Sequence, residues 1–245
     1  MEKRTLMKHN NCYIYPKTVR EMIEGKRHYE INGDEKLPSV TTILSGTQDP
    51  EKAQSLKAWR DRIGEETATR IVDEAAARGT AMHKILERYI GEEGYLDLTQ
   101  VGKNAHNMAM RIIEQGLSNV TEYYGLESTL FYPGLYAGAT DMIALHKGEM
   151  AIIDFKQTNK PKKREWIDDY CLQLAAYAMA HNYVYKTNIN KGVIMMCSKD
   201  NYYQEFVIAG DEFKKYKYKW LGKISKYYKQ KGRDNERRED KPTNT

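Results

Sequence analysis

Two short apolar runs stand on either side of a candidate hairpin turn near the middle of the chain. Residues 142–145 (Met-Ile-Ala-Leu) precede Lys147-Gly148, and residues 151–153 (Ala-Ile-Ile) follow it. Uninterrupted apolar runs of this length are typical of strands buried on both faces. A glycine at the second turn position supplies the positive φ that a two-residue turn requires. The pattern therefore predicts two antiparallel strands, at 137–146 and 149–156.

This register places charged residues inside a buried sheet. Asp141 is expected directly opposite Asp154, with Cβ atoms about 4.5–5.5 Å apart. Lys156 points to the same face because side chains alternate along a strand, and the small Ala139 opposite it leaves room. Two carboxylates this close repel each other in an apolar sheet unless a cation joins them. A hard divalent ion such as Mg²⁺ fits that role, so we expect a phosphodiester-cleaving site.

The rest of the pattern predicts alternating helices and strands. Helices are expected at 41–44, from Asp49-Pro50 to about residue 90 with a break near Gly64, at 102–116, at 165–181 and at 211–230, and further strands at 122–132, 191–197 and 202–208. We expect an α/β protein in three parts: a β-like or irregular segment at 1–36, a single domain at 37–230 and a disordered tail at 231–245. Within the domain, an added helical section at 37–118 precedes the αβ core at 119–230.

The last predicted helix carries one apolar stripe and one basic face. The stripe is formed by residues spaced three or four apart, Phe213, Tyr216, Trp220, Ile224 and Tyr227. Its lysines serve equally well for solubility or for contact with nucleic acid. A second basic group follows the strand that carries Asp154, and there we favour contact with phosphates: Lys156, Lys160, Lys162, Lys163 and Arg164.

Composition narrows the class of protein. The 245 residues carry a formal net charge of +5 and contain no apolar run near the ~20 residues of a membrane span, so we expect no membrane association. From the first residues of this sequence, we expect neither a secretory signal nor an Arg- and Ser-rich transit peptide. We therefore expect a cytoplasmic protein of bacterial or phage origin (host cytoplasm for a phage protein) in preference to a mitochondrial one. The three widely spaced cysteines, Cys12, Cys171 and Cys197, are expected to be reduced thiols.

Four short motifs occur in one order along the chain. They are Arg78-Gly79-Thr80-Ala81-Met82-His83, Gly138-Ala139-Thr140-Asp141, Asp154-Phe155-Lys156 and Gln173-Leu174-Ala175-Ala176-Tyr177. In this order they resemble the PD-(D/E)XK nucleases of the RecB type. The stretch Pro38-Ser39-Val40-Thr41-Thr42-Ile43-Leu44 is similar to the opening motif of the mitochondrial genome maintenance exonucleases and their phage relatives. The resemblance covers roughly residues 30 to 210.

The resemblance implies a restriction-endonuclease-like core and a set of roles. His83, Asp141, Asp154 and the carbonyl of Phe155 would hold Mg²⁺ or Mn²⁺, with Lys156 acting at the scissile phosphate. Residues expected to contact DNA or to position it are Gln173, Tyr177, Ser39, Thr41, Thr42, Arg78, Lys160, Lys162 and Lys163. Some relatives carry an iron–sulfur cluster on four cysteines, and three cysteines cannot build that cluster.

Several of these residues have plainer alternatives. A lone helical histidine such as His83 is often structural, and Tyr177 suits an amphipathic helix core. The hydroxyls of Ser39, Thr41 and Thr42 serve equally as helix caps. Glu127 is a nearby carboxylate without an assigned role.

We expect a DNA exonuclease that prefers single-stranded ends, and replication or recombination proteins as possible partners. A structure- or sequence-specific endonuclease on the same core is the alternative enzyme. If the protein is not an enzyme, the alternative is a non-catalytic subunit that binds nucleic acid.

Overall fold

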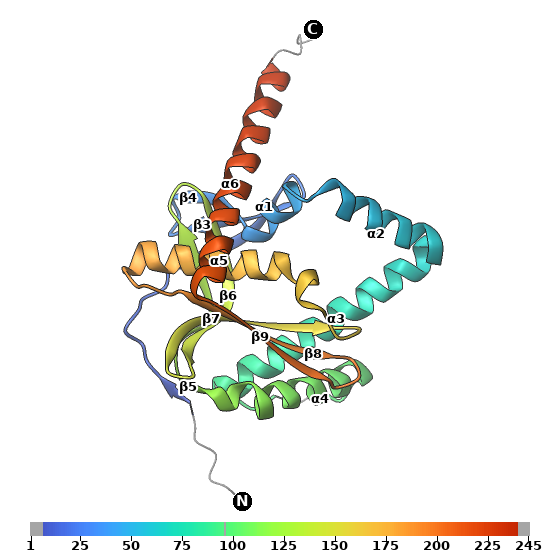
Figure 1. Ribbon diagram of the computed structural model, residues 1–245, viewed down its shortest axis with the longest axis vertical. Coiled ribbons are helices and arrows are strands. Elements are labelled where there is room, and N and C mark those ends of the chain that lie inside the picture. The colour runs from blue at the N-terminus through green and yellow to red at the C-terminus, as the bar shows by residue number, and fades with distance from the viewer. Residues whose placement is uncertain (1–6, 96, 240–245) are drawn as a thin grey trace, which may run out of the picture.

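A six-stranded mixed sheet forms the centre of the computed structural model, which describes residues 7–95 and 97–239 (Figure 1). Its strands, in spatial order, are β1 (Lys8–His9), β5 (Val120–Tyr132), β6 (Tyr136–His146), β7 (Glu149–Thr158), β8 (Lys191–Ser198) and β9 (Tyr203–Ala209). The pairs β1–β5 and β7–β8 are parallel, and the other neighbours are antiparallel. Helices cover both faces, which confirms the expected α/β class with a mixed central sheet.

The hairpin between β6 and β7 has the turn that the sequence predicts. Lys147 and Gly148 have φ values of 52° and 81°, the positive values of a tight two-residue turn. The register runs from His146 opposite Glu149 to Met142 opposite Ile153. The prediction is confirmed for these pairs, and both apolar runs are buried except for the half-buried Leu145.

The two faces of the sheet have separate cores. The helices α3 (Glu65–Ile90) and α4 (Gln100–Gln115) cover one face, where Met142 and Ile153 are buried. The helices α1 (Val40–Gly46), α5 (Asp168–Tyr185) and α6 (Gly210–Glu239) contribute to the core on the other face. The apolar stripe predicted on the last helix is buried in this second core.

A small three-stranded sheet covers one end of the core. It consists of β2 (Thr18–Ile23), β3 (Lys26–Ile31) and β4 (Glu35–Pro38). Tyr29, Ile31 and Leu37 pack with Ala137 of β6, and the chain passes from β4 directly into α1. The described part of the segment expected to be β-like or irregular thus contains strands joined by irregular stretches, and its first six residues lie outside the described residues.

The helix α2 (Pro50–Ile63) stands apart from the core and buries none of its residues. It ends at Gly64, whose φ of 86° lies in the left-handed region, and α3 starts at the next residue. Figure 1 shows α2 and the first part of α3 meeting at an angle beside the body of the protein. This angled pair is the break that the sequence predicts near Gly64.

Two helices have bounds that differ from the expectation by three residues or more. The fourth predicted helix begins at Asp168, after a 3₁₀ turn, η2 (Arg164–Trp166), and continues to Tyr185. The disordered tail expected from residue 231 is wrong up to Glu239, because α6 continues to that residue and projects from the body (Figure 1). The sequence there is rich in Lys, Arg and Glu, which are good helix formers, so a helix already anchored by its buried stripe extends through them. Residues 240–245 lie outside the described part.

A second 3₁₀ turn, η1 (Leu117–Asn119), joins α4 to β5. Within residues 7–95 and 97–239, no helix has the length and apolar character needed to cross a membrane.

Candidate active site

The candidate site lies at a fork where β6 and β7 separate. The ladder between these strands ends at Met142 and Ile153, one pair before the two aspartates. Beyond it, β6 stays paired with β5 and forms one isolated bridge, from Ala137 to Ser39, and β7 stays paired with β8, where Asp154 lies opposite Ile194. The expected pairing of Lys156 with Ala139 is therefore wrong, because the ladder between β6 and β7 ends before these two residues.

At this fork, Asp141 and β7 are joined by a different contact. The backbone N–H of Phe155 donates a 2.6 Å hydrogen bond to Oδ2 of Asp141. The N–H of Phe155 has no partner in the ladder between β6 and β7, and the carboxylate of Asp141 accepts its hydrogen bond instead. A buried carboxylate needs such a donor. The two predicted aspartates are near neighbours in space, but they are not a cross-strand pair.

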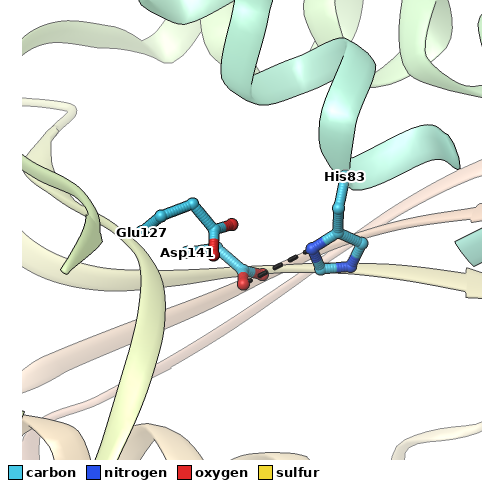
Figure 2. A group of neighbouring side chains, drawn as sticks. All are labelled: His83, Glu127 and Asp141. Carbon is cyan, nitrogen blue, oxygen red and sulfur yellow. Dashed lines mark ion pairs between the residues drawn. The ribbon is translucent and has the colours of Figure 1, made fainter. Parts of the chain in front are cut away.

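On its other side, Asp141 of β6 meets two further side chains, one from α3 and one from β5 (Figure 2). His83 of α3 places Nδ1 3.4 Å from Oδ1 of Asp141. Glu127 of β5 completes the group, and one possible ligand atom from each residue lies within 4.8 Å of the others. Such a set of two carboxylates and one imidazole suits a divalent ion that accepts mixed oxygen and nitrogen ligands, as Mn²⁺ does.

Glu127 is the member that the sequence left without a role. It lies in the β5–β6 register opposite Asp141, between the pairs Leu126–Met142 and Ser128–Thr140. Only the pairing of β5 with β6 reveals this position, and two irregularities near the start of β5 shift that register.

The backbone of Glu127 is unusual for a strand. Its φ of 47° lies in the left-handed region, which costs a non-glycine residue about 1–3 kcal/mol. Loss of hydration and the nearby charge of Asp141 raise the pKa of the Glu127 carboxyl to about 7. The side chain keeps contact with solvent. An acid that holds its proton near neutral pH, in a conformation that costs energy, is a feature of functional sites.

The second predicted aspartate forms an ion pair with the predicted lysine. Oδ2 of Asp154 lies 2.5 Å from Nζ of Lys156, and the side chains are 2% and 19% exposed. Burial raises the pKa of Asp154 to about 6, although Lys156 opposes this change. Burial acts to lower the pKa of Lys156, but Asp154 and Asp141 outweigh it and raise the pKa. The lysine is therefore charged and fixed beside the carboxylates.

The charges of His83 and Asp141 depend on each other. Burial acts to lower the pKa of His83, and the carboxylate of Asp141 raises it overall. Burial acts to raise the pKa of Asp141, but His83, Lys156 and the N–H of Phe155 lower it overall. A cation that replaced the proton on His83 would find Asp141 already ionised.

The motif at 173–177 lies next to this site through its tyrosine. The amide of Gln173 donates a 3.0 Å hydrogen bond to the hydroxyl of Tyr177, whose side chain is buried. The ring of Tyr177 lies against Gly138, where an added Cβ would be 2.8 Å from a ring carbon. The glycine three residues before Asp141 therefore makes room for the tyrosine, which joins two of the sequence motifs in space.

Arg78 and Gly79 hold the loop after β7 against α3. The guanidinium of Arg78 donates to the side chains of Gln157, at 3.0 Å, and Asn159. The amide of Gln157 donates to the carbonyl of Ala75 at 2.8 Å, and a Cβ at Gly79 would lie 3.3 Å from the Gln157 side chain. Arg78, expected to contact DNA, is thus occupied in positioning this loop. On the loop itself, Lys160 and Lys163 are exposed and Lys162 is half-buried.

The hydroxyl residues at the start of α1 act mainly as caps. Ser39 accepts a 3.0 Å hydrogen bond from the N–H of Thr42, and the hydroxyl of Thr42 donates to the carbonyl of Arg27. Ser39 and Thr42 are buried, whereas Thr41 is exposed. Of these three residues, only Thr41 offers its side chain to a polymer at the surface.

The fold and the site define an α/β protein with a candidate divalent-metal site of carboxylates and one histidine, set beside a half-buried lysine. Comparison with known proteins identifies relatives with one name, mitochondrial genome maintenance exonuclease 1. The mouse protein is 30% identical over 203 residues, which are 78% of this chain and 59% of the mouse protein. The human protein is 27% identical over 210 residues, and the Xenopus tropicalis protein is 28% identical over 228 residues.

The chain matches about three fifths of the length of these relatives, 59% to 60%. No family model matches it. A crystal structure of a candidate exonuclease from Eubacterium rectale aligns with a TM-score of 0.44 and 11% identity, over 64% of this chain and 65% of that one. The sequence similarity to named exonucleases agrees with the motif resemblance.

Proposed function

We propose that this chain is a metal-dependent deoxyribonuclease that removes nucleotides from DNA ends, with a preference for single strands. The observation that carries the proposal is the convergence of His83, Glu127 and Asp141 at the fork, with the ion pair of buried Asp154 and half-buried Lys156 beside them. The relatives are named as exonucleases of mitochondrial genome maintenance, and these names support the same activity.

The donor atoms fit a hard or borderline divalent ion. Asp141 and Asp154 are almost fully buried carboxylates, and buried carboxylates need a compensating charge. With the Phe155 carbonyl expected from the motif, His83, Glu127 and Asp141 would hold Mg²⁺ or Mn²⁺. When bound, such an ion lowers the pKa of water and stabilises charge on the phosphate group.

The protein's own side chains would carry the remaining tasks. Lys156 would place its ammonium group where negative charge develops on the phosphate, or would orient the attacking water. Gln173 and Tyr177 would hold the DNA and the lysine in place from α5. The single strand would approach past the angled pair formed by α2 and the first part of α3. All of α2 lies outside the core, so its surface is open to such a strand.

The test is digestion of end-labelled linear and circular single-stranded DNA with Mg²⁺, Mn²⁺ or EDTA. The proposal expects loss of the linear substrate only, and only with metal. Cleavage of circles would assign an endonuclease instead. Binding without cleavage would assign a non-catalytic subunit. Double-stranded and RNA substrates in the same assay measure the preference for single-stranded DNA.

A further inference from the structure

A pocket of about 430 Å³ lies beside the end of β7, next to the candidate active site. It is lined by Ala75 of α3, residues 157–162, Trp166 of η2 and Tyr170 of α5. Pockets that hold small molecules are commonly ~300–1,000 Å³. This volume is therefore in the range that a single small group can fill.

Two aromatic rings give this pocket its character. Trp166 is 57% exposed, although a large apolar ring is usually buried. Nζ of Lys163 lies 5.4 Å from the centre of the Trp166 ring. Tyr170 connects the pocket to the site, because Nζ of Lys156 lies 5.2 Å from the centre of its ring. A group in the pocket would therefore be close to the reacting phosphate.

The loop that lines the pocket is held in place from several sides. The side chain of Gln204 accepts from the N–H of Lys162 at 2.8 Å and donates to its carbonyl at 2.9 Å. The hydroxyl of Thr158 donates to the carbonyl of Lys160 at 2.9 Å. With the hydrogen bonds from Arg78, these bonds fix the backbone before any ligand arrives, which lowers the entropy cost of binding.

The charge around the pocket is positive. In the described part of the chain, no ion pair involves Lys160, Lys162 or Lys163. The acids at the start of α5 are already paired, Asp168 with Lys219 at 3.4 Å and Asp169 with Lys52. Glu165, also exposed, is the opposing charge on this segment. Three lysines beside an exposed indole thus form a positively charged rim next to an aromatic surface.

We propose that this pocket holds one nucleotide of the single-stranded substrate next to the scissile phosphate, with its base against Trp166 and Tyr170 and its phosphate facing Lys160 and Lys162. The proposal rests on the proposed nuclease function and adds a nucleotide subsite to it. Stacking on an aromatic ring accepts any base, which suits an enzyme that must pass along a sequence. Lysines supply the salt-dependent part of the same interaction.

The first test measures binding of fluorescent oligo(dT) by anisotropy in EDTA, and digestion of the same oligonucleotide with Mg²⁺. Because a stacked base contributes about 1–3 kcal/mol, Trp166→Ala should raise Kd and KM about tenfold and change kcat less than about threefold. Trp166→Phe should recover most of the binding. Lys160→Gln with Lys162→Gln should lower the salt dependence of Kd, by up to about one unit of slope for each phosphate that a lysine no longer neutralises.

Tyr183→Ala is the matched control. Tyr183 is an exposed aromatic residue with a lysine, Lys186, 4.9 Å from its ring centre, but it lies near the opposite end of α5. This variant should bind and digest like the wild type. Melting temperatures of all variants distinguish a defect in binding from a defect in folding.

The second test uses oligonucleotides that each lack one base, at successive positions from the end. The wild type should be sensitive to one missing base near the scissile phosphate, and Trp166→Ala should lose that sensitivity. If the wild type digests DNA and Trp166→Ala binds equally well with the same positional profile, the subsite is wrong and the nuclease proposal stands. If the wild type neither binds nor digests DNA, both proposals are wrong.

Discussion

The backbone N–H of Phe155 donates a hydrogen bond of 2.6 Å to Oδ2 of Asp141 across the fork between β6 and β7. Oδ1 of the same carboxylate faces His83 at 3.4 Å. One oxygen thus anchors the carboxylate to the sheet, and the other faces the cluster of possible ligands. This geometry separates the structural and the chemical tasks of Asp141, and the predictions below depend on it.

Replacing either buried aspartate should abolish cleavage and leave the fold intact. In Asp141→Asn the amide oxygen can still accept the Phe155 N–H, and the negative charge needed by the metal is gone. Asp154→Asn removes the other buried charge. Both variants should bind single-stranded DNA with nearly unchanged Kd. Asp34→Asn, in the exposed turn before β4, is the control and should be fully active. Near-normal turnover in a folded variant of either aspartate would refute the assignment.

Lys156→Ala should slow the chemical step by a factor of about 10² or more, since a charge placed at the developing transition state has been removed. Loss of the ammonium also removes the group that lowers the pKa of Asp154, so that pKa should rise above about 6. The measurement is therefore the pH profile of single-turnover cleavage with saturating Mg²⁺, because the rate on its high-pH plateau is the rate with Asp154 ionised. An unchanged single-turnover rate combined with weakened metal binding would mean that Lys156 acts only by maintaining Asp154.

His83→Ala should weaken metal binding without erasing the site, because carboxylates supply the other ligand atoms. Mn²⁺ binds mixed nitrogen and oxygen ligands more tightly than Mg²⁺, so it should restore the variant better than Mg²⁺ does. Titration of each metal against activity gives the half-maximal concentration. A lower melting temperature with unchanged metal dependence would instead make His83 a packing residue.

Glu127→Gln should raise the melting temperature of the metal-free protein at pH 8 and should raise it much less at pH 5. The carboxyl has a pKa of about 7 in the folded protein, against 4.5 as the ordinary value. The folded state thus holds this proton more tightly than the unfolded state, and that stabilisation is present below pH 4.5 and lost as the pH rises through about 7. Glutamine does not ionise, so the variant does not lose this stabilisation as the pH rises.

Added Mg²⁺ should reverse the order at pH 8, because the ion stabilises the wild type through Glu127 and the glutamine variant less. Thermal unfolding in EDTA and in Mg²⁺, at both pH values, provides the measurement. Equal melting temperatures of the two proteins at pH 8 in EDTA would contradict the assignment of Glu127.

Gly138→Ala should lower both stability and activity through Tyr177. The new Cβ would meet a ring carbon at 2.8 Å, and overpacking of this kind costs about 1–3 kcal/mol. Gly222→Ala on α6 is the control, since nothing lies within 4 Å of its added Cβ. Alanine in an open helical position should be neutral or stabilising. Combining Gly138→Ala with Tyr177→Leu should recover part of the melting temperature and none of the activity. Full activity in Gly138→Ala would show that the position of Tyr177 is unimportant.

Much of the fold follows from local patterns. The alternation of apolar runs with turn residues predicts β6, β7 and the turn at Lys147-Gly148, and the register follows from the turn. The buried stripe of α6 follows from helical periodicity. The predicted end of α6 is wrong because a highly charged segment can form either a solvated helix or a disordered tail. Here the segment continues a helix that is anchored by its buried stripe, and it is therefore helical.

By itself, the sequence determined that Asp141, Asp154 and Lys156 lie on adjoining strands, because hairpin register and strand alternation are local properties. The tertiary structure decided what each of them contacts. The ladder between β6 and β7 ends just before the aspartates, while β7 stays paired with β8. Asp141 therefore takes the Phe155 N–H, and Asp154 pairs with Lys156. The arrival of His83 from α3 and Glu127 from β5 depends on contacts between segments far apart in the chain. Those contacts arise from the packing of a helix on a sheet and from the pairing of strands, which no local pattern encodes.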